Sequence, residues 1–114
     1  MNKLVVAYLD DILESIDLIG QYVHETPEIH FSQNKQLQDS VIRRLVIIGE
    51  AAGKIPTDIR EQAPDVPWRT IIGFRNVAIH DYASVHMGRV WEIIQTELSV
   101  LKKQITTLRS KNFP

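Results

Sequence analysis

Apolar residues recur at steps of three and four along nearly the whole chain, which is the repeat of an amphipathic α-helix. Four segments show this pattern strongly enough to predict a main helix, and none shows the strict alternation typical of a β-strand. These segments extend over 5–23, 32–55, 67–80 and 87–108. The pattern therefore predicts an all-α fold.

Local signals predict where these helices begin and end. The Thr26-Pro27 pair should end the first, because the residue before a proline disfavours the α conformation. Ser32 is a candidate N-cap for the second, and Pro67 is favoured as the first residue of the third. Residues 58–61 have the form of a capping box and predict one short helical turn.

The last segment has the most regular pattern, with steps of four and three that form a heptad seam. A second apolar row flanks this seam, and a stripe that wide is typical of a bundle helix rather than of a lone two-stranded coiled coil. The seam consists of Met87, Trp91, Ile94, Leu98, Leu101, Ile105 and Leu108, and the second row of Val90, Ile93 and Val100. We predict one domain over 1–114, an antiparallel bundle of four main helices plus a short helical turn.

Length and composition narrow the class of protein. The 114 residues suit one domain with a sizeable core, and an apolar content of 44% excludes a wholly disordered chain. The apolar runs are far shorter than the ~20 residues of a membrane span, and acidic residues follow the N-terminus too soon for a signal peptide. The chain has no cysteine, which excludes disulfides and zinc–thiolate sites and fits a cytoplasmic location.

Charge is unevenly distributed along the chain, although the net charge is only −1. Residues 1–30 contain six acidic residues against one basic residue, whereas 31–114 contain twelve basic and eight acidic residues. The later part could receive a polyanion locally. Charge alone favours the simpler interpretation, in which solvated helix faces balance after folding.

Three possible sites are disfavoured by their spacing. Residues 49–54 resemble a phosphate-binding loop, but they have three rather than four residues between the glycines and lie in a helical stripe, so their small residues are expected to pack helices. Asp10, Glu14 and Asp17 share one helix face and are expected to be solvated rather than to hold a cation. No Glu-x-x-His pair occurs, and we predict no metal site.

The segment 75–82 combines an arginine, an amide, an imidazole and a phenol. Asn76 and His80 are four residues apart and can share a helix face. Arg75 and His80 are separated by about 140° on a regular helix, so they converge only if the helix loosens or if the long arginine bridges the gap. A purely structural role stays open for all three residues. Arg75 could pair with an acid such as Glu50, and Tyr82 could be a half-buried anchor. His80 could be a C-terminal helix residue that the helix dipole favours.

Arg-x4-His followed two residues later by tyrosine resembles the signature of the HEPN superfamily. The surrounding chain is similar to its HepT-like branch, the toxins of HepT–MntA toxin–antitoxin pairs. The supporting segments are 44–54, 66–73 and 90–95.

This resemblance implies an α-helical, metal-independent endoribonuclease without a cofactor, which acts on RNA as a homodimer. Arg75 and His80 would then be catalytic and Asn76 would support them. Tyr82 would accept AMP units from an MntA-like nucleotidyltransferase antitoxin, and this modification would silence the nuclease.

The chemistry of these residues fits RNA cleavage by transesterification. The imidazole of a histidine such as His80 can accept or donate a proton, while Arg75 offers a charged fork to phosphate oxygens. One histidine cannot easily perform both proton transfers, and a two-fold dimer would supply a second. Further phosphate contacts could come from four arginines, for which surface solvation is the default: Arg43, Arg44, Arg69 and Arg89.

Two alternatives remain open at this stage. The chain could be a non-catalytic HEPN interaction module that binds a nucleotidyltransferase partner or a nucleotide. It could also be a structural dimerisation bundle in which the Arg–His segment only packs, and burial of His80 would favour that hypothesis.

Overall fold

The computed structural model describes residues 3–113, and all regular structure in this range is helical. No helix in it is long and apolar enough to cross a membrane. The elements are α1 (Lys3–Tyr22), α2 (Glu28–Gln33), α3 (Lys35–Lys54), α4 (Thr57–Arg60), α5 (Trp68–His80), the 3-10 helix η1 (Tyr82–Ser84), α6 (Met87–Thr96) and α7 (Leu98–Asn112). The predicted all-α bundle is confirmed.

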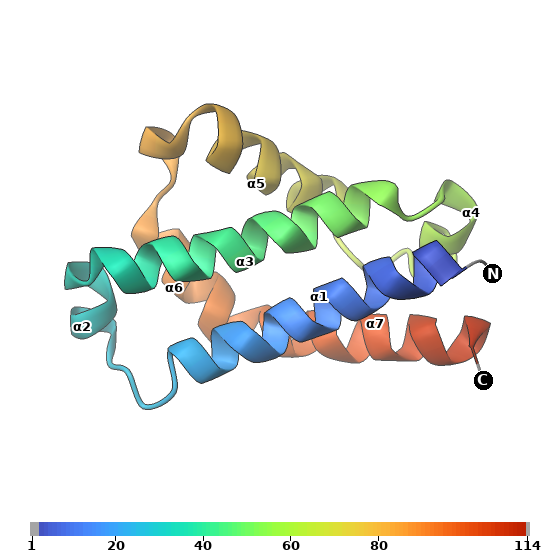
Figure 1. Ribbon diagram of the computed structural model, residues 1–114, viewed down its shortest axis with the longest axis horizontal. Coiled ribbons are helices and arrows are strands. Elements are labelled where there is room, and N and C mark those ends of the chain that lie inside the picture. Colours follow the sequence, from blue (N-terminus) through green and yellow to red (C-terminus); the bar gives the residue numbers. More distant parts are fainter. Residues whose placement is uncertain (1–2, 114) are drawn as a thin grey trace.

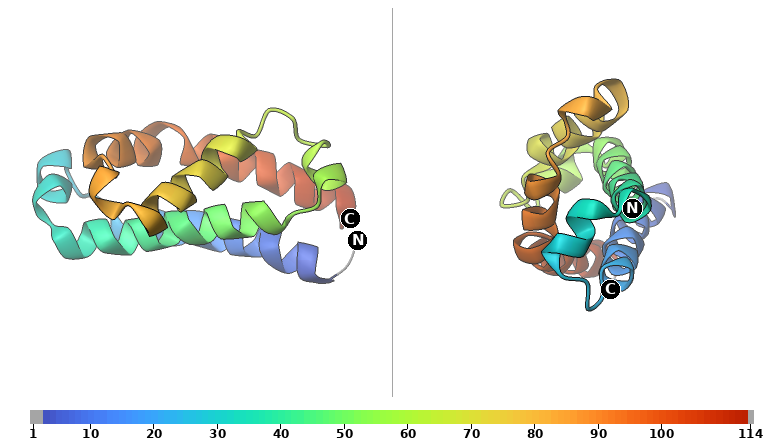
Figure 2. Two further views of the ribbon diagram at one scale, coloured as in Figure 1. Left: turned by 90° about the horizontal axis from the view of Figure 1, so that it is seen from above. Right: turned by 90° about the vertical axis from the view of Figure 1, so that its left-hand side faces the viewer.

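Helix α3 lies at the centre of the bundle (Figure 1). It runs antiparallel to α1 on one side and to α5 on the other, and α7 packs along α1. The N-terminal end of α1 and the C-terminal end of α7 lie together at one end of the molecule (Figure 2). The C-terminal end of α5 lies toward the opposite end. The segment 75–82 is therefore presented at one end of the bundle.

The core forms where the predicted apolar stripes meet. Fully burying one such aliphatic side chain contributes about 1.5–3 kcal/mol to folding, so the stripes determine how the helices pack. The buried residues include Leu9, Ile12 and Ile19 of α1, Val41, Ile48 and Ala52 of α3, and Leu101, Ile105 and Leu108 of α7.

The second predicted helix begins later than expected, so the assignment of Ser32 as its N-cap was wrong. Ser32 lies inside the short helix α2, where its hydroxyl donates to the carbonyl of Ile29 at 2.8 Å. Asn34 caps α3 instead, and its side-chain oxygen accepts from the backbone N–H of Leu37 at 3.0 Å. Serine and asparagine cap helices about equally well, so local preference could not choose between them.

The connection from α3 to α5 also differs slightly from the prediction. The predicted helical turn exists as α4, but its N-cap is Pro56 and no side chain caps it. Pro67 is the N-cap of α5 rather than its first residue. Side chains hold this connection, because Arg60 donates to the carbonyl of Ile55 at 2.8 Å and Trp68 to that of Ala63 at 3.1 Å.

The predicted fourth helix is in fact two helices, α6 and α7, separated at Glu97. This bend lets α6 contact α2 while α7 follows α1. The seam stays buried beyond the bend at Leu98 and Leu101, but Val100 of the second row is 53% exposed. Neither proline nor glycine marks the bend, so the apolar pattern could not reveal it.

The acidic N-terminal helix pairs with the basic C-terminal helix. Arg109 donates to Asp10 at 2.6 Å, and Lys102 donates to Asp17 at 2.7 Å. The interpretation that the uneven charges balance after folding is therefore confirmed for these two carboxylates.

Candidate active site

Helix α5 reaches its position because α3 has a glycine at the closest point of contact. A Cβ atom at Gly49 would lie 3.0 Å from the carbonyl oxygen of Ile71 and would collide with Cβ of Arg75. Gly49 is thus a helix-packing residue within α3, as predicted for the small residues of 49–54. It sets the distance between α3 and the backbone that bears Arg75.

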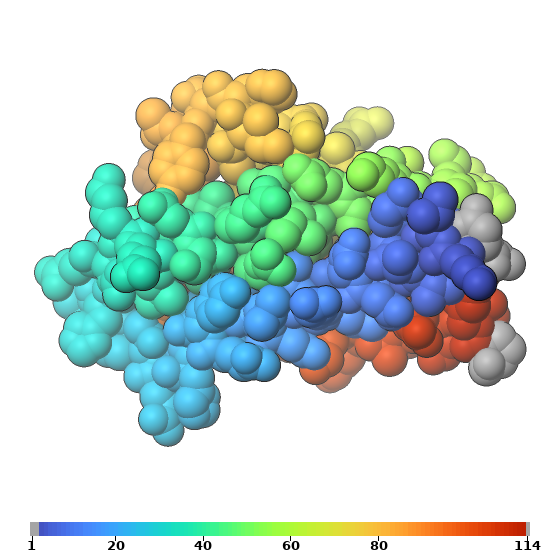
Figure 3. Space-filling view, in the orientation of Figure 1, coloured from blue at the N-terminus to red at the C-terminus, as the bar shows by residue number. Residues whose placement is uncertain are grey.

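A second apolar cluster holds the C-terminal half of α5. Ile42 and Val46 of α3 are buried against Ala78, and Phe74, Val85 and Met87 pack around them. Beyond this cluster the chain turns outward, and residues 76–84 form the gold ridge that projects above α3 in Figure 3. The candidate residues therefore lie on a fixed but exposed edge of the molecule.

Arg75 is held by two oxygen acceptors. Its Nη1 atom donates to the side-chain oxygen of Asn76 at 3.1 Å, and its Nη2 atom lies 3.9 Å from Oε1 of Glu50. The side chains of Arg75 and Glu50 are 32% and 37% exposed, so solvent screens the pair only in part. The predicted structural partner, Glu50, is present, and the guanidinium still reaches the surface.

His80 is the last residue of α5 and is exposed. The helix stays regular up to this residue and does not loosen, so Arg75 and His80 remain on different faces. Across residues 3–113, no hydrogen bond or ion pair joins these two side chains. Asn76 is exposed as well, and its spacing puts it on the face of His80. The exposure of His80 argues against the purely structural bundle.

Tyr82 lies in η1 and is tied to α3. Its hydroxyl donates a hydrogen bond to the carboxylate of Asp39, and its side chain remains 44% exposed. The pKa of Tyr82 is raised from 10.0 to about 12, chiefly by this hydrogen bond. Partial burial and the charge of Asp39 raise it further, in that order of size. The phenol is therefore a neutral hydrogen-bond donor at physiological pH.

Sequence analysis missed Asp39. This residue is 43 positions from Tyr82, and no motif connects the two. The only signal was its place on α3, four residues before Arg43 and eleven before Glu50, which a helix aligns on one side. Finding it required knowledge of how α3 and α5 pack.

The four additional arginines have different surroundings. Arg89 pairs with Glu92 at 3.1 Å and with Glu97, whose hydrogen bond raises the pKa of the guanidinium. Arg43 and Arg69 are exposed and Arg44 is half-buried, and none of the three forms an ion pair among the described residues. Solvent therefore surrounds Arg43 and Arg69, whereas two carboxylates offset the charge of Arg89.

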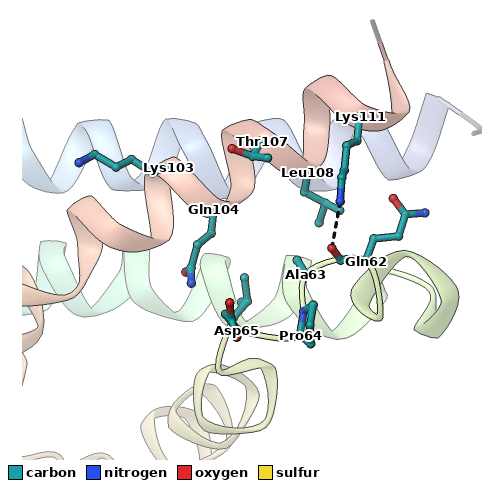
Figure 4. Close-up of a pocket in the computed structure, with 10 residues that line it drawn as sticks. Gln62, Ala63, Pro64, Asp65, Lys103, Gln104, Thr107, Leu108 and Lys111 are labelled. Atoms are coloured by element: carbon teal, nitrogen blue, oxygen red, sulfur yellow. Dashed lines mark hydrogen bonds between the residues drawn. The ribbon is translucent and has the colours of Figure 1, made fainter.

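Two surface hollows differ in whether the predicted residues line them. The one drawn in Figure 4 lies between α7 and the loop before α5, where Lys111 donates to the carbonyl of Gln62 at 3.5 Å. It lies toward the C-terminal end of α7, whereas the C-terminal end of α5, which bears His80, is at the opposite end of the bundle. A second hollow, between α3 and α5, is lined by Arg75 and Asn76 together with Gly49, Glu50, Gly53, Lys54 and Ile72. Within 3–113, no three His, Asp or Glu side chains are grouped closely enough to hold a metal ion.

Comparison with known proteins supports the resemblance noted for residues 75–82. A family model described as "Ribonuclease HepT-like" matches residues 12–108. A "Probable ribonuclease HepT" of Thermococcus cleftensis is 37% identical over 102 residues, which are 90% of this chain and 93% of that protein.

Two proteins of Methanocaldococcus jannaschii are also similar. One, named "Putative RNase", is 38% identical over 101 residues, covering 89% of this chain and 93% of the relative. The other, named "Gamma-glutamylcyclotransferase and putative RNase", is 41% identical over 105 residues, and the match covers 92% of this chain but only 47% of that longer protein. No solved structure matches. Since the family model and these relatives align with most of its length, the chain belongs to the ribonuclease HepT-like family.

Proposed function

We propose that this protein is an endoribonuclease toxin that cleaves RNA without a metal ion, in a cleft formed by two copies of the chain. The observation that supports this most is the display of Asn76 and His80 on the exposed end of α5, next to Arg75, in a chain of the HepT-like ribonuclease family.

The reaction uses the nucleophile that RNA supplies. The 2′-oxygen attacks the adjacent phosphorus, the bond to the 5′-oxygen breaks, and a 2′,3′-cyclic phosphate end forms. One His80 accepts the proton of the 2′-hydroxyl, and the His80 of a second copy donates a proton to the leaving 5′-oxygen. Arg75 stabilises the charge that develops on the phosphate oxygens, and Asn76 orients its guanidinium through the 3.1 Å hydrogen bond.

The arrangement within one chain favours a site completed by a second chain. Arg75 lies against α3 and pairs with Glu50, whereas the exposed His80 is about 140° further around α5, so one copy alone does not surround a phosphate. Val77 lies three residues before His80, on the same face of α5, and is 42% exposed. A two-fold contact along this face of α5 would cover Val77 and bring two His80 side chains together.

Regulation by a nucleotidyltransferase antitoxin belongs to the same proposal. Tyr82 is two residues beyond His80, and 44% of the residue is exposed at the surface where a partner enzyme would approach. AMP units on Tyr82 would place negative charge and bulk where RNA phosphates must bind. The modification would therefore silence the nuclease.

The nuclease proposal is tested by RNA cleavage with purified protein in a metal chelator. Wild type should cut RNA and leave a cyclic phosphate end, and His80→Ala should lose at least about a hundredfold in rate. His86→Ala is the matched control, since His86 is also exposed and lies six residues further on. Equal rates for His80→Ala and wild type would exclude the mechanism. RNA or partner binding without any cleavage would instead support the non-catalytic interaction module.

The acceptor is tested by mass spectrometry after co-expression with an MntA-type nucleotidyltransferase. Wild type should gain multiples of the mass of AMP, and Tyr82→Phe should gain none. Tyr22→Phe is the control, because Tyr22 is similarly exposed at 39%. The same uptake by Tyr82→Phe and wild type would assign the acceptor to another residue.

A further inference from the structure

The carboxylate of Asp39 is directed to the hydroxyl of Tyr82. Asp39 is exposed on α3 and accepts the Tyr82 hydrogen bond, and among residues 3–113 it forms no ion pair with a lysine, arginine or histidine. The other acidic group next to Tyr82 is engaged elsewhere, since Asp81 accepts from the hydroxyl of Ser84. Of these two carboxylates, Asp39 is therefore the one that accepts the hydrogen bond of the Tyr82 hydroxyl.

A phenol that joins a phosphorus atom must lose its proton in the same reaction. The pKa of Tyr82 is raised to about 12, so very little of the reactive phenolate exists at neutral pH. A positioned base removes this obstacle by taking the proton as the new bond forms. His80 is close in sequence, but no hydrogen bond joins it to Tyr82 among the described residues, whereas the Tyr82 hydroxyl already donates a hydrogen bond to Asp39.

We propose that Asp39 is the proton acceptor for nucleotidyl transfer to Tyr82. The Tyr82 oxygen attacks the α-phosphorus of a nucleoside triphosphate, the bond from that phosphorus to the β-phosphate bridging oxygen breaks, and pyrophosphate leaves. The phenolic proton passes to the carboxylate of Asp39. This inference rests on the proposed function, in which Tyr82 is the acceptor.

The role of Asp39 is limited to the first nucleotide. Once Tyr82 is esterified, its oxygen has no proton to donate, and a later AMP unit must attach to a hydroxyl of the previous nucleotide. Loss of Asp39 should therefore slow the appearance of singly modified protein and leave the number of AMP units on each modified molecule unchanged. A general defect in docking of the partner enzyme would slow every addition.

The experiment is a mass-spectrometric time course with ATP and a purified MntA-type nucleotidyltransferase that modifies the wild-type chain. Asp39→Asn should slow the first addition about a hundredfold, through the maximal rate rather than through the KM for the acceptor protein. Asp39→Glu should recover part of the rate, because it restores a carboxylate on the same face of α3. Asp81→Asn is the control, as it removes an equal charge next to Tyr82 and should react like wild type. Thermal unfolding of each variant verifies folding.

The outcomes distinguish the role of Asp39 from the proposal that Tyr82 accepts AMP. If Asp39→Asn gains its first AMP at the wild-type rate, Asp39 is not the proton acceptor, while Tyr82 remains the acceptor of AMP. If Asp39→Asn and Asp39→Glu are equally slow, the carboxylate acts on structure rather than on the proton. If Tyr82→Phe is modified like wild type, the acceptor assignment itself fails.

Discussion

Glu50 and Arg75 pair across the contact between α3 and α5, with Nη2 of Arg75 3.9 Å from Oε1 of Glu50. Both side chains are about one-third exposed, so the pair contributes only about 0–1 kcal/mol to stability. Its larger effect concerns RNA, because the same guanidinium is proposed to bind a phosphate. Glu50 repels that phosphate and competes for the cation.

The first prediction is that Glu50→Gln binds RNA a few-fold more tightly than wild type at low salt, since one repelling charge is gone. The free energy of unfolding should fall by less than about 1 kcal/mol. Fluorescence anisotropy with a His80→Ala background, which prevents cleavage, measures the affinity. Glu92→Gln removes one of the two acidic partners of Arg89 on α6 and should leave RNA affinity unchanged. Weaker binding by Glu50→Gln would mean that Glu50 chiefly positions Arg75.

The second prediction concerns the glycine at the α3–α5 contact. Gly49→Ala should lower the free energy of unfolding by about 1–3 kcal/mol, because the new methyl group collides with Cβ of Arg75 and with backbone that cannot move aside easily. The rate of RNA cleavage should fall by more than the loss of folded protein accounts for, because the guanidinium of Arg75 is displaced. Denaturant unfolding and cleavage rates test both effects.

Gly20→Ala is the control for Gly49→Ala. Gly20 is also helical, but nothing lies within 4 Å of an added Cβ. Alanine there should stabilise the protein by about 0.4–1 kcal/mol, because it reduces the entropy of the unfolded chain. Similar stability for the two variants would contradict the close approach of α5 at Gly49.

The fold could be predicted because its helices follow their apolar stripes. Leu9, Ile48 and Ile105 are buried as the steps of three and four require. The bend at Glu97 could not be predicted, because it serves the packing of α6 against α2 and leaves the apolar pattern uninterrupted.

Only the part of the candidate site that is continuous in sequence could be predicted. Asn76, His80 and Tyr82 are candidates because they are close in sequence and form a motif. Asp39 and the packing role of Gly49 against Arg75 depend on how two helices align, and no local pattern contains that information. Helix geometry predicts an angular separation of about 140° between Arg75 and His80, and α5 is a regular helix over both residues.

The third prediction tests whether two copies of His80 serve one cleft. Wild type and His80→Ala are mixed in equal amounts and allowed to exchange subunits. If each cleavage needs both histidines, only dimers of two wild-type chains are active, and about one quarter of the activity of undiluted wild type remains. Independent sites within each chain would leave about one half. Mixing wild type with His86→Ala should leave the activity unchanged and controls for exchange itself.

The fourth prediction follows from the hydrogen bond between Tyr82 and Asp39. The pKa of Tyr82 is raised from 10.0 to about 12, so the folded state holds this proton more tightly than the unfolded state does. The stability that the bond provides is therefore complete below pH 10 and is lost as the pH rises from about 10 to about 12. Asp39→Asn removes the carboxylate and should lower the pKa of Tyr82 toward 10. Ultraviolet titration of tyrosinate, with Tyr82→Phe subtracted to isolate this residue, measures the pKa in both proteins. An identical Tyr82 titration in wild type and Asp39→Asn would show that the phenol does not donate to Asp39 in solution, and it would remove the basis for assigning Asp39 a part in the modification.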